Sequence, residues 1–238
     1  MRVLFFLCSL FIAIRTNAQV GTGPEIGVGM SSMHFAPPTM PILYTSASVS
    51  GIFSGKAGWL IDVPLNKHFY FQGGIAISRK GAVRSFSFHE NDSNNEQVNQ
   101  TLTIYYLDAP LTVLYKTGEQ GKGRFIAGIG VTPSYIVGGR NKLQDNLDSA
   151  GVHTNTSDNL PIYIGNTVAG FDIGVNLLAG YELSTGLFFK AYYTVGANDI
   201  GVGTEVDKNR MWGVSAGYFL SKNRNINKAA DDLIDHTK

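Results

Sequence analysis

The chain has 238 residues, and its 19 lysines and arginines are balanced by 18 aspartates and glutamates, for a formal net charge of +1. Balanced charge gives no electrostatic basis for binding nucleic acid, so we expect no such partner. The single cysteine is Cys8, so the rest of the chain can form no disulfide and carries no thiol chemistry. No apolar run after residue 18 is long enough for a membrane-spanning helix, which excludes a helical membrane protein.

The N-terminal residues have the pattern of a secretory signal peptide. A basic start precedes a short apolar run, and a small-residue site ends at Ala18. This order predicts a signal peptide over residues 1–18 that is cleaved after Ala18. The run is too short for a transmembrane anchor, and Cys8 comes too early to become the first residue of a mature lipoprotein.

The rest of the chain is a succession of segments in which apolar and polar residues alternate. In the first of them, Ile26 and Val28 alternate with Glu25 and Gly27. Side chains point alternately to the two faces of a strand, so each segment predicts a strand with one apolar and one polar face. Eight segments show the pattern: 24–33, 51–63, 69–78, 105–116, 125–137, 167–183, 187–200 and 211–220.

The connections between these strands alternate between long and short, as in outer-membrane barrels with short periplasmic turns and longer outside loops. The outside loops are predicted at 34–50, 80–100, 140–166 and 201–209, with the outer parts of 80–100 continuing the flanking strands. An even strand number lets an antiparallel sheet close without an unpaired edge, which the bilayer requires. We therefore predict an all-β fold, an eight-stranded antiparallel transmembrane β-barrel in the cell outer membrane.

The predicted domain organisation has three parts. Residues 1–18 form the signal peptide, residues 19–220 form the barrel, and residues 221–238 form a polar periplasmic tail. Because charged residues gather on one face of the strands and aromatic residues on the other, a secreted soluble barrel with an apolar interior fits the pattern less well.

The stretch 105–116 is about as long as a tilted strand that crosses a bilayer. Its apolar face begins at Tyr105 and ends at Tyr115, and tyrosines are enriched at the two membrane interfaces. Within this stretch, Tyr106-Leu107-Asp108-Ala109-Pro110-Leu111 resembles the signature strand of the PorT-like outer-membrane β-barrel family. Asp108 stands where that family more often has glutamate, and Ala109 where it has a larger aliphatic residue.

Two further features match the habits of that family. One is the close of the second strand, Asp62-Val63-Pro64-Leu65, and the other is the end of the final strand, Gly217-Tyr218-Phe219. The resemblance covers roughly residues 20–220 and implies the barrel fold but says little about activity. A tail follows Phe219, so the terminal aromatic that assembly machinery reads in outer-membrane barrels would be internal here.

The alternation predicts a charged barrel interior. The ionisable residues on polar strand faces are Glu25, Lys56, Asp62, Asp108, Lys116, Asp172, Glu182 and Lys190. An eight-stranded barrel has room for little besides side chains, and buried charges must be paired. We interpret these residues as a lumenal ionisable network that plugs the interior, with a narrow polar pore as the alternative. We hypothesise that Asp108 pairs with Lys56 or Lys190.

Residues with catalytic or metal-binding chemistry are sparse. His34, His89 and His153 fall in three outside loops, which leaves a surface metal site as an alternative to solvated histidines. Ser87 and His89 share a face near the outer rim, as a membrane-surface lipid hydrolase would need, but no acid partner is evident. The Gly-x-Gly pairs lack the strand-to-helix context of a dinucleotide site. We therefore expect no metal, no cofactor and no enzymatic activity.

Together these observations predict an integral outer-membrane protein with a structural, surface-interaction or assembly role. The alternatives are a small outer-membrane pore and a membrane-surface lipid hydrolase. The expected partners are outer-membrane lipid, the outer-membrane assembly machinery, and a protein that contacts the outside loops or the periplasmic tail.

Overall fold

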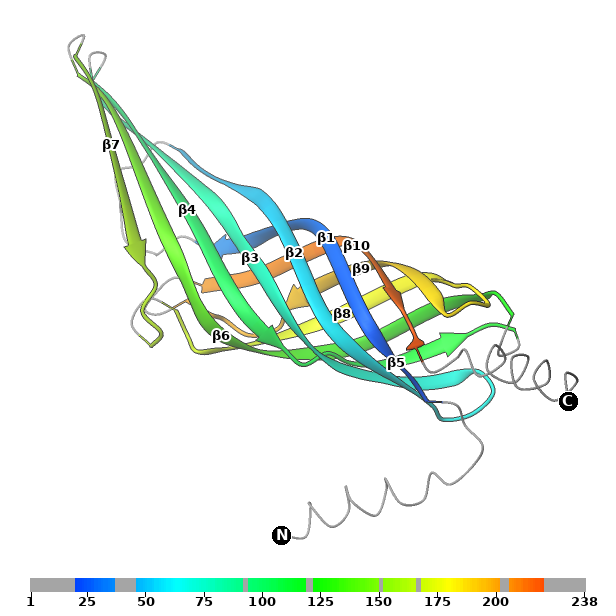
Figure 1. The fold of residues 1–238 in the computed structure, drawn as a ribbon. Helices are drawn as coiled ribbons and strands as arrows, with labels where there is room; N and C mark the ends of the chain where they lie inside the picture. Colours follow the sequence, from blue (N-terminus) through cyan, green and yellow to red (C-terminus); the bar gives the residue numbers. More distant parts are fainter. Residues whose placement is uncertain are drawn as a thin grey trace, which may run out of the picture.

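A computed structural model of the chain shows a closed antiparallel β-barrel with a sheet that projects from one end (Figure 1). The structure describes residues 20–36, 46–91, 94–118, 122–149, 152–165, 168–201 and 206–220. The predicted signal peptide and the predicted tail lie outside these described residues. None of the described residues belongs to a helix long and apolar enough to cross a membrane.

Nearly all of the described chain is strand. The strands are β1 (Gly21–Ala36), β2 (Ser46–Pro64), β3 (Phe69–Asn91), β4 (Asn94–Asp108), β5 (Leu111–Lys116), β6 (Arg124–Ser149), β7 (Val152–Pro161), β8 (Phe171–Glu182), β9 (Leu187–Gly196) and β10 (Val206–Tyr218). The ring closes because β1 pairs with β2 on one side and with β10 on the other.

The ring has eight positions because β4 and β5 share one of them. Both strands pair with β3 on one side and with β6 on the other. The register with β3 is unbroken, since Ala76 lies opposite Asp108 and Gly73 lies opposite Leu111. The two strands are separated at Pro110, which has no N–H to donate to the ladder. The predicted eight-stranded antiparallel barrel is confirmed, and β7 lies outside the ring, paired with β6.

The outward face of the ring is apolar. Ile26 and Phe125 are each 66% exposed, although they lie in the middle of a β-sheet surface. Exposed aromatic residues gather toward both ends of the strands, as in the aromatic girdles of membrane barrels. Those toward the outer end are Phe53, Tyr105, Tyr135, Phe171, Tyr193 and Trp212, and those toward the short turns are Phe69, Tyr115, Phe125, Tyr181 and Phe189. The predicted assignment of faces therefore matches the exposure of these side chains.

Two of the predicted outside loops are largely β-structure. β3 continues to Asn91 and β4 begins at Asn94, so most of 80–100 is a long hairpin. In 140–166, which was predicted as a loop, β6 continues to Ser149 and β7 folds back on it. β2 and β10 also begin earlier than predicted, at Ser46 and Val206. These segments are polar on both faces outside the membrane, so the alternation that marks the ring strands is absent there.

The projecting part of these strands forms one sheet, in the order β2, β3, β4, β6 and β7 (Figure 1). We call it the outer sheet, and it comprises 46–51, 82–91, 94–103, 140–149 and β7. Its outermost strand, β7, pairs along its whole length with β6. The outer sheet extends the barrel wall beyond the apolar band on one side of the ring.

Candidate functional site

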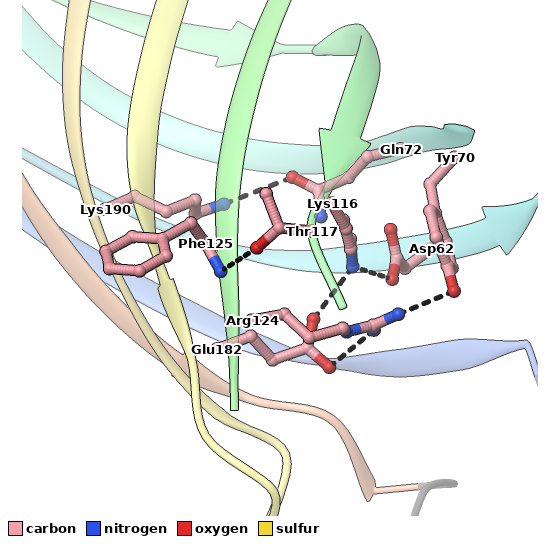
Figure 2. A network of polar contacts seen from close by, with 9 residues as sticks. All are labelled: Asp62, Tyr70, Gln72, Lys116, Thr117, Arg124, Phe125, Glu182 and Lys190. Atoms are coloured by element: carbon pink, nitrogen blue, oxygen red, sulfur yellow. Dashed lines mark hydrogen bonds and ion pairs between the residues drawn. The ribbon is translucent and has the colours of Figure 1, made fainter. Parts of the chain in front are cut away.

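A buried polar network crosses the barrel interior near the short turns (Figure 2). Lys116 Nζ lies 2.5 Å from Asp62 Oδ2 and 2.9 Å from Glu182 Oε2. Arg124 donates one hydrogen bond to Glu182 at 2.9 Å and another to Tyr70 Oη at 2.6 Å. The side chains come from β2, β3, β5, β6 and β8 and converge on one point inside the ring (Figure 2). Both cations are almost fully buried, and each is matched by an acid as burial of charge requires.

A second group of charges centres on Glu25. Lys190 Nζ lies 2.7 Å from Glu25 Oε1, and Lys56 Nζ lies 3.2 Å from Glu25 Oε2. Ser215 donates a further hydrogen bond to Glu25 at 2.7 Å, and Lys190 also donates to Gln72 at 3.1 Å. This one carboxylate therefore joins the first strand to β2, β9 and β10, which are its neighbours in the closed ring or lie next to them.

Asp108 does not pair with Lys56 or Lys190, so the hypothesis made from the sequence is wrong. Asp108 accepts hydrogen bonds from Ser134 Oγ at 2.6 Å and from Lys80 Nζ at 3.3 Å. Lys80 lies on β3, next to the strand that carries Asp108, whereas Lys56 and Lys190 are both engaged by Glu25. The Lys80 ammonium also lies 4.4 Å from the centre of the Tyr106 ring, so two residues of the motif strand hold this cation.

Toward the outer end of the barrel, the polar contacts involve amides as well as charges. Asn209 donates to Asp172 at 2.7 Å and to Tyr106 Oη at 2.8 Å. Arg84 and Asp207 form a buried ion pair. Within the described residues Asp172 has no ion-pair partner, so the amide of Asn209 supplies its hydrogen bond.

The eight residues predicted from the sequence all lie on the inward face, but they form several groups rather than one network. Seven of them take part in ion pairs, and Asp172 bonds to an amide. Sequence reasoning missed four further members of the interior: Lys80, Arg84, Arg124 and Asp207. Lys80 and Arg84 continue the every-second-residue pattern of Ser78 on β3, and extending that count would have found them.

Apolar side chains close the interior on both sides of the charged layers. The outer cluster contains Met33, Ala82, Leu102, Ile104, Tyr106, Ile136, Ile162, Val168 and Ile200. The inner cluster, near the short turns, contains Leu60, Tyr70, Leu114, Ile126, Phe188 and Phe219. Phe219 follows the end of β10, and its ring centre lies 4.7 Å from that of Phe188. Space between the strands is also limited, since a Cβ added to Gly128 would lie 2.4 Å from a methyl group of Leu114.

The described residues do not assemble a catalytic or metal-binding constellation. Among them, no three His, Cys, Asp or Glu side chains lie close enough to hold a metal ion. Ser87 lies in the outer sheet on β3, and no described His, Asp or Glu side chain is hydrogen-bonded to it. The side chains of His89 and His153 lie outside the described part, so the surface metal and Ser87–His89 alternatives extend beyond it.

Comparisons with solved structures found three small outer-membrane proteins that resemble this chain, at low identity and low structural similarity. Ail, the attachment invasion locus protein of Yersinia pestis, in complex with the heparin analogue sucrose octasulfate, shares 13% identity, with 84% of this chain and 98% of that chain covered and a TM-score of 0.36. Neisserial surface protein A shares 10% identity, with 84% and 99% covered and a TM-score of 0.36. OprG of Pseudomonas aeruginosa shares 9% identity, with 84% and 96% covered and a TM-score of 0.30.

No curated protein matches the chain. A family model does match it, namely the outer membrane protein beta-barrel domain, over residues 15–202. This match covers most of the chain and agrees with the closed ring of eight strand positions and its apolar outward face. The chain belongs to the outer membrane protein beta-barrel domain family, and it is an integral β-barrel protein of the outer membrane.

Proposed function

We propose that the protein is a non-enzymatic, non-conducting barrel that anchors the outer sheet at the cell surface as a contact surface for other molecules. The observation that carries this proposal is the filled interior. Charged side chains such as Lys116 and Arg124 are almost fully buried and paired, and apolar clusters lie on both sides of them. Side chains rather than water occupy the centre of the barrel, as in other barrels of this size.

The filled interior disfavours the small pore considered from the sequence. An ion on a path through the barrel would have to displace the outer cluster, the ion pairs and the inner cluster in turn. Each displaced ion pair would leave a buried charge without a partner, which costs several kcal/mol. The interior therefore stabilises the wall of the barrel and offers no continuous polar path.

Single-channel recording of the full-length protein in planar bilayers tests this proposal. We expect no current steps from the folded protein, with a known porin in the same bilayer as the positive control. Steps that persist in wild-type protein, and that change in size when Lys116 is replaced by methionine, would contradict the proposal and support the pore.

The outer sheet has the composition of a contact surface. Its outward side chains are almost all uncharged and polar, namely Ser48, Ser50, Ser85, Ser87, Gln97, Asn99, Thr101, Gln144, Ser157 and Asn159. Hydroxyl and amide groups can both donate and accept hydrogen bonds. A protein partner predicted at the outside loops would therefore meet a rigid sheet rather than flexible loops.

We also propose the finer assignments made from the sequence. Residues 1–18 would be the signal peptide, 19–220 the barrel and 221–238 a periplasmic tail, within the PorT-like group of barrels. The assembly machinery would read an aromatic signal near Phe219, and lipid of the outer membrane would surround the ring. Sequencing the N-terminus of the mature protein tests the first assignment, since cleavage after Ala18 makes Gln19 the first residue.

A further inference from the structure

A set of basic side chains lies on the outward surface near the outer end of the apolar band. The five residues are Arg79 on β3, Arg140 and Lys142 on β6, and Lys208 and Arg210 on β10. Their register partners face outward: Arg79 lies opposite Tyr105, which is 41% exposed, and Arg210 lies two residues from Trp212, which is 59% exposed. We call these five residues the basic rim.

The basic rim has no acidic counterpart. Within the described part of the chain, none of its five residues takes part in an ion pair, whereas the inward bases do. The acids of the ring strands, among them Glu25, Asp108 and Asp172, occupy inward positions and are buried. The outward surface near the outer end therefore carries positive charge alone among its described strand residues.

A β-bulge places two members of the rim on the outward face. Tyr106 pairs with Ile136, but the next residue, Tyr105, pairs with Gly138, so Val137 is an extra residue in β6. Simple alternation counted from the buried Ile136 would turn Arg140 inward. Because the bulge shifts the pattern by one residue, Arg140 pairs with the outward Thr103 and its side chain is exposed.

The rim residues form two patches on opposite sides of the barrel. Arg79, Arg140 and Lys142 flank β4, while Lys208 and Arg210 lie on β10, four ring positions away. Arg79 and Arg140 are two strands and two residues apart, so standard sheet spacing puts their Cα atoms about 12 Å from each other. Long side chains at this spacing can reach the same headgroup.

We propose that the basic rim binds the phosphate groups of phosphorylated glycolipid in the outer leaflet. The rim borders the surface that lipid chains cover, so anionic lipid headgroups are the charges that it meets first. Arginine and lysine at a membrane surface attract such headgroups, and arginine can donate two parallel hydrogen bonds to a phosphate. This inference goes beyond the proposed contact function, and it does not depend on whether the interior conducts.

Lipid binding to the folded full-length protein in detergent micelles tests the proposal. The probes are diphosphoryl lipid A, the same lipid without its phosphates, and inorganic phosphate, with bound lipid counted by native mass spectrometry. We expect the triple variant Arg79→Gln, Arg140→Gln, Lys142→Gln to bind diphosphoryl lipid A more weakly, by about fivefold for each base removed. We expect the dephosphorylated lipid to bind wild type and variant equally.

Two controls keep the result interpretable. Lys67→Gln removes an exposed base in the turn after β2, at the other end of the barrel, and should leave lipid A binding unchanged. Replacing both arginines with lysine should restore most of the binding, because the charge returns. The gel shift of the folded barrel before and after boiling checks that each variant folds.

Three outcomes would overturn the proposal. The first is equal affinity of wild type and triple variant for diphosphoryl lipid A. The second is equal affinity of wild type for lipid A with and without phosphates. The third is a variant that loses binding of a soluble sulfated polysaccharide while its lipid A binding is unchanged, which would assign the rim to a soluble polyanion. Displacement of lipid A by millimolar inorganic phosphate would support a site that recognises the phosphate itself.

Discussion

Arg79 and Lys80 are neighbours in the chain, yet they belong to opposite environments. Lys80 points into the barrel, where it is 5% exposed and bonds to Asp108. Arg79 points outward, opposite Tyr105, and no described acid pairs with it. The same division holds for the whole ring, with inward bases paired and outward bases unpaired. The inward charges hold the barrel together, so the outward charges are free to act on something outside it.

The largest effect should come from removing Lys116. The Lys116→Met variant would leave Asp62 and Glu182 buried without their shared cation, and we expect a loss of about 3–5 kcal/mol in the free energy of unfolding. Urea unfolding of the barrel in lipid vesicles measures this loss. Lys67→Met is the matched control, since its side chain is exposed in a turn. An unchanged midpoint for Lys116→Met would mean that the interior network does not support the fold.

Phe219→Ala should have an effect of similar or slightly smaller size. The substitution leaves a cavity in the inner cluster beside Phe188, and burial loss of this kind costs about 3–5 kcal/mol for a fully buried phenylalanine. Phe219→Leu, which keeps most of the volume, should lose much less. Equal stability of the alanine and leucine variants would show that this side chain does not pack in the barrel.

Lys56→Gln should destabilise the barrel less than Lys116→Met. The Lys56 side chain is 22% exposed, and Glu25 would keep its contacts with Lys190 and Ser215. We expect a loss of about 1 kcal/mol, typical of a partly exposed pair with a remaining partner. Lys190→Gln in the same experiment should cost more, because its ammonium is the closer and more buried partner of Glu25.

Arg79→Gln should have the smallest effect on stability and gives the sharpest comparison with its neighbour. In vesicles without phosphorylated glycolipid we expect a change within about 0.5 kcal/mol, as for surface substitutions in general. Lys80→Gln in the same vesicles should destabilise the barrel clearly, because Asp108 would lose its cation. Similar losses for the two variants would remove the distinction between interior and rim.

The faces of the ring strands could be predicted from the sequence because lipid imposes an apolar residue at every second position. The outer sheet could not, because no such demand acts above the membrane and Ser, Asn, Gln and Thr stand on its outward face. The partner of Asp108 depends on how far neighbouring strands are staggered, and alternation within one strand contains no information on stagger. The outward position of Arg140 depends on a bulge at Val137, which no local pattern marks.

The pairing of β1 with β10 has a consequence for how the protein is made. Glu25 and Ser215, which bond across that seam, are separated by 190 positions in the chain. The edge of β1 therefore stays unpaired until almost the whole barrel sequence has been synthesised and delivered to the membrane. Contacts of such long sequence separation form slowly, and an exposed strand edge invites pairing with other chains. A chain that ends before β10 would keep two open edges, so we expect truncated copies to be degraded or to aggregate rather than to insert.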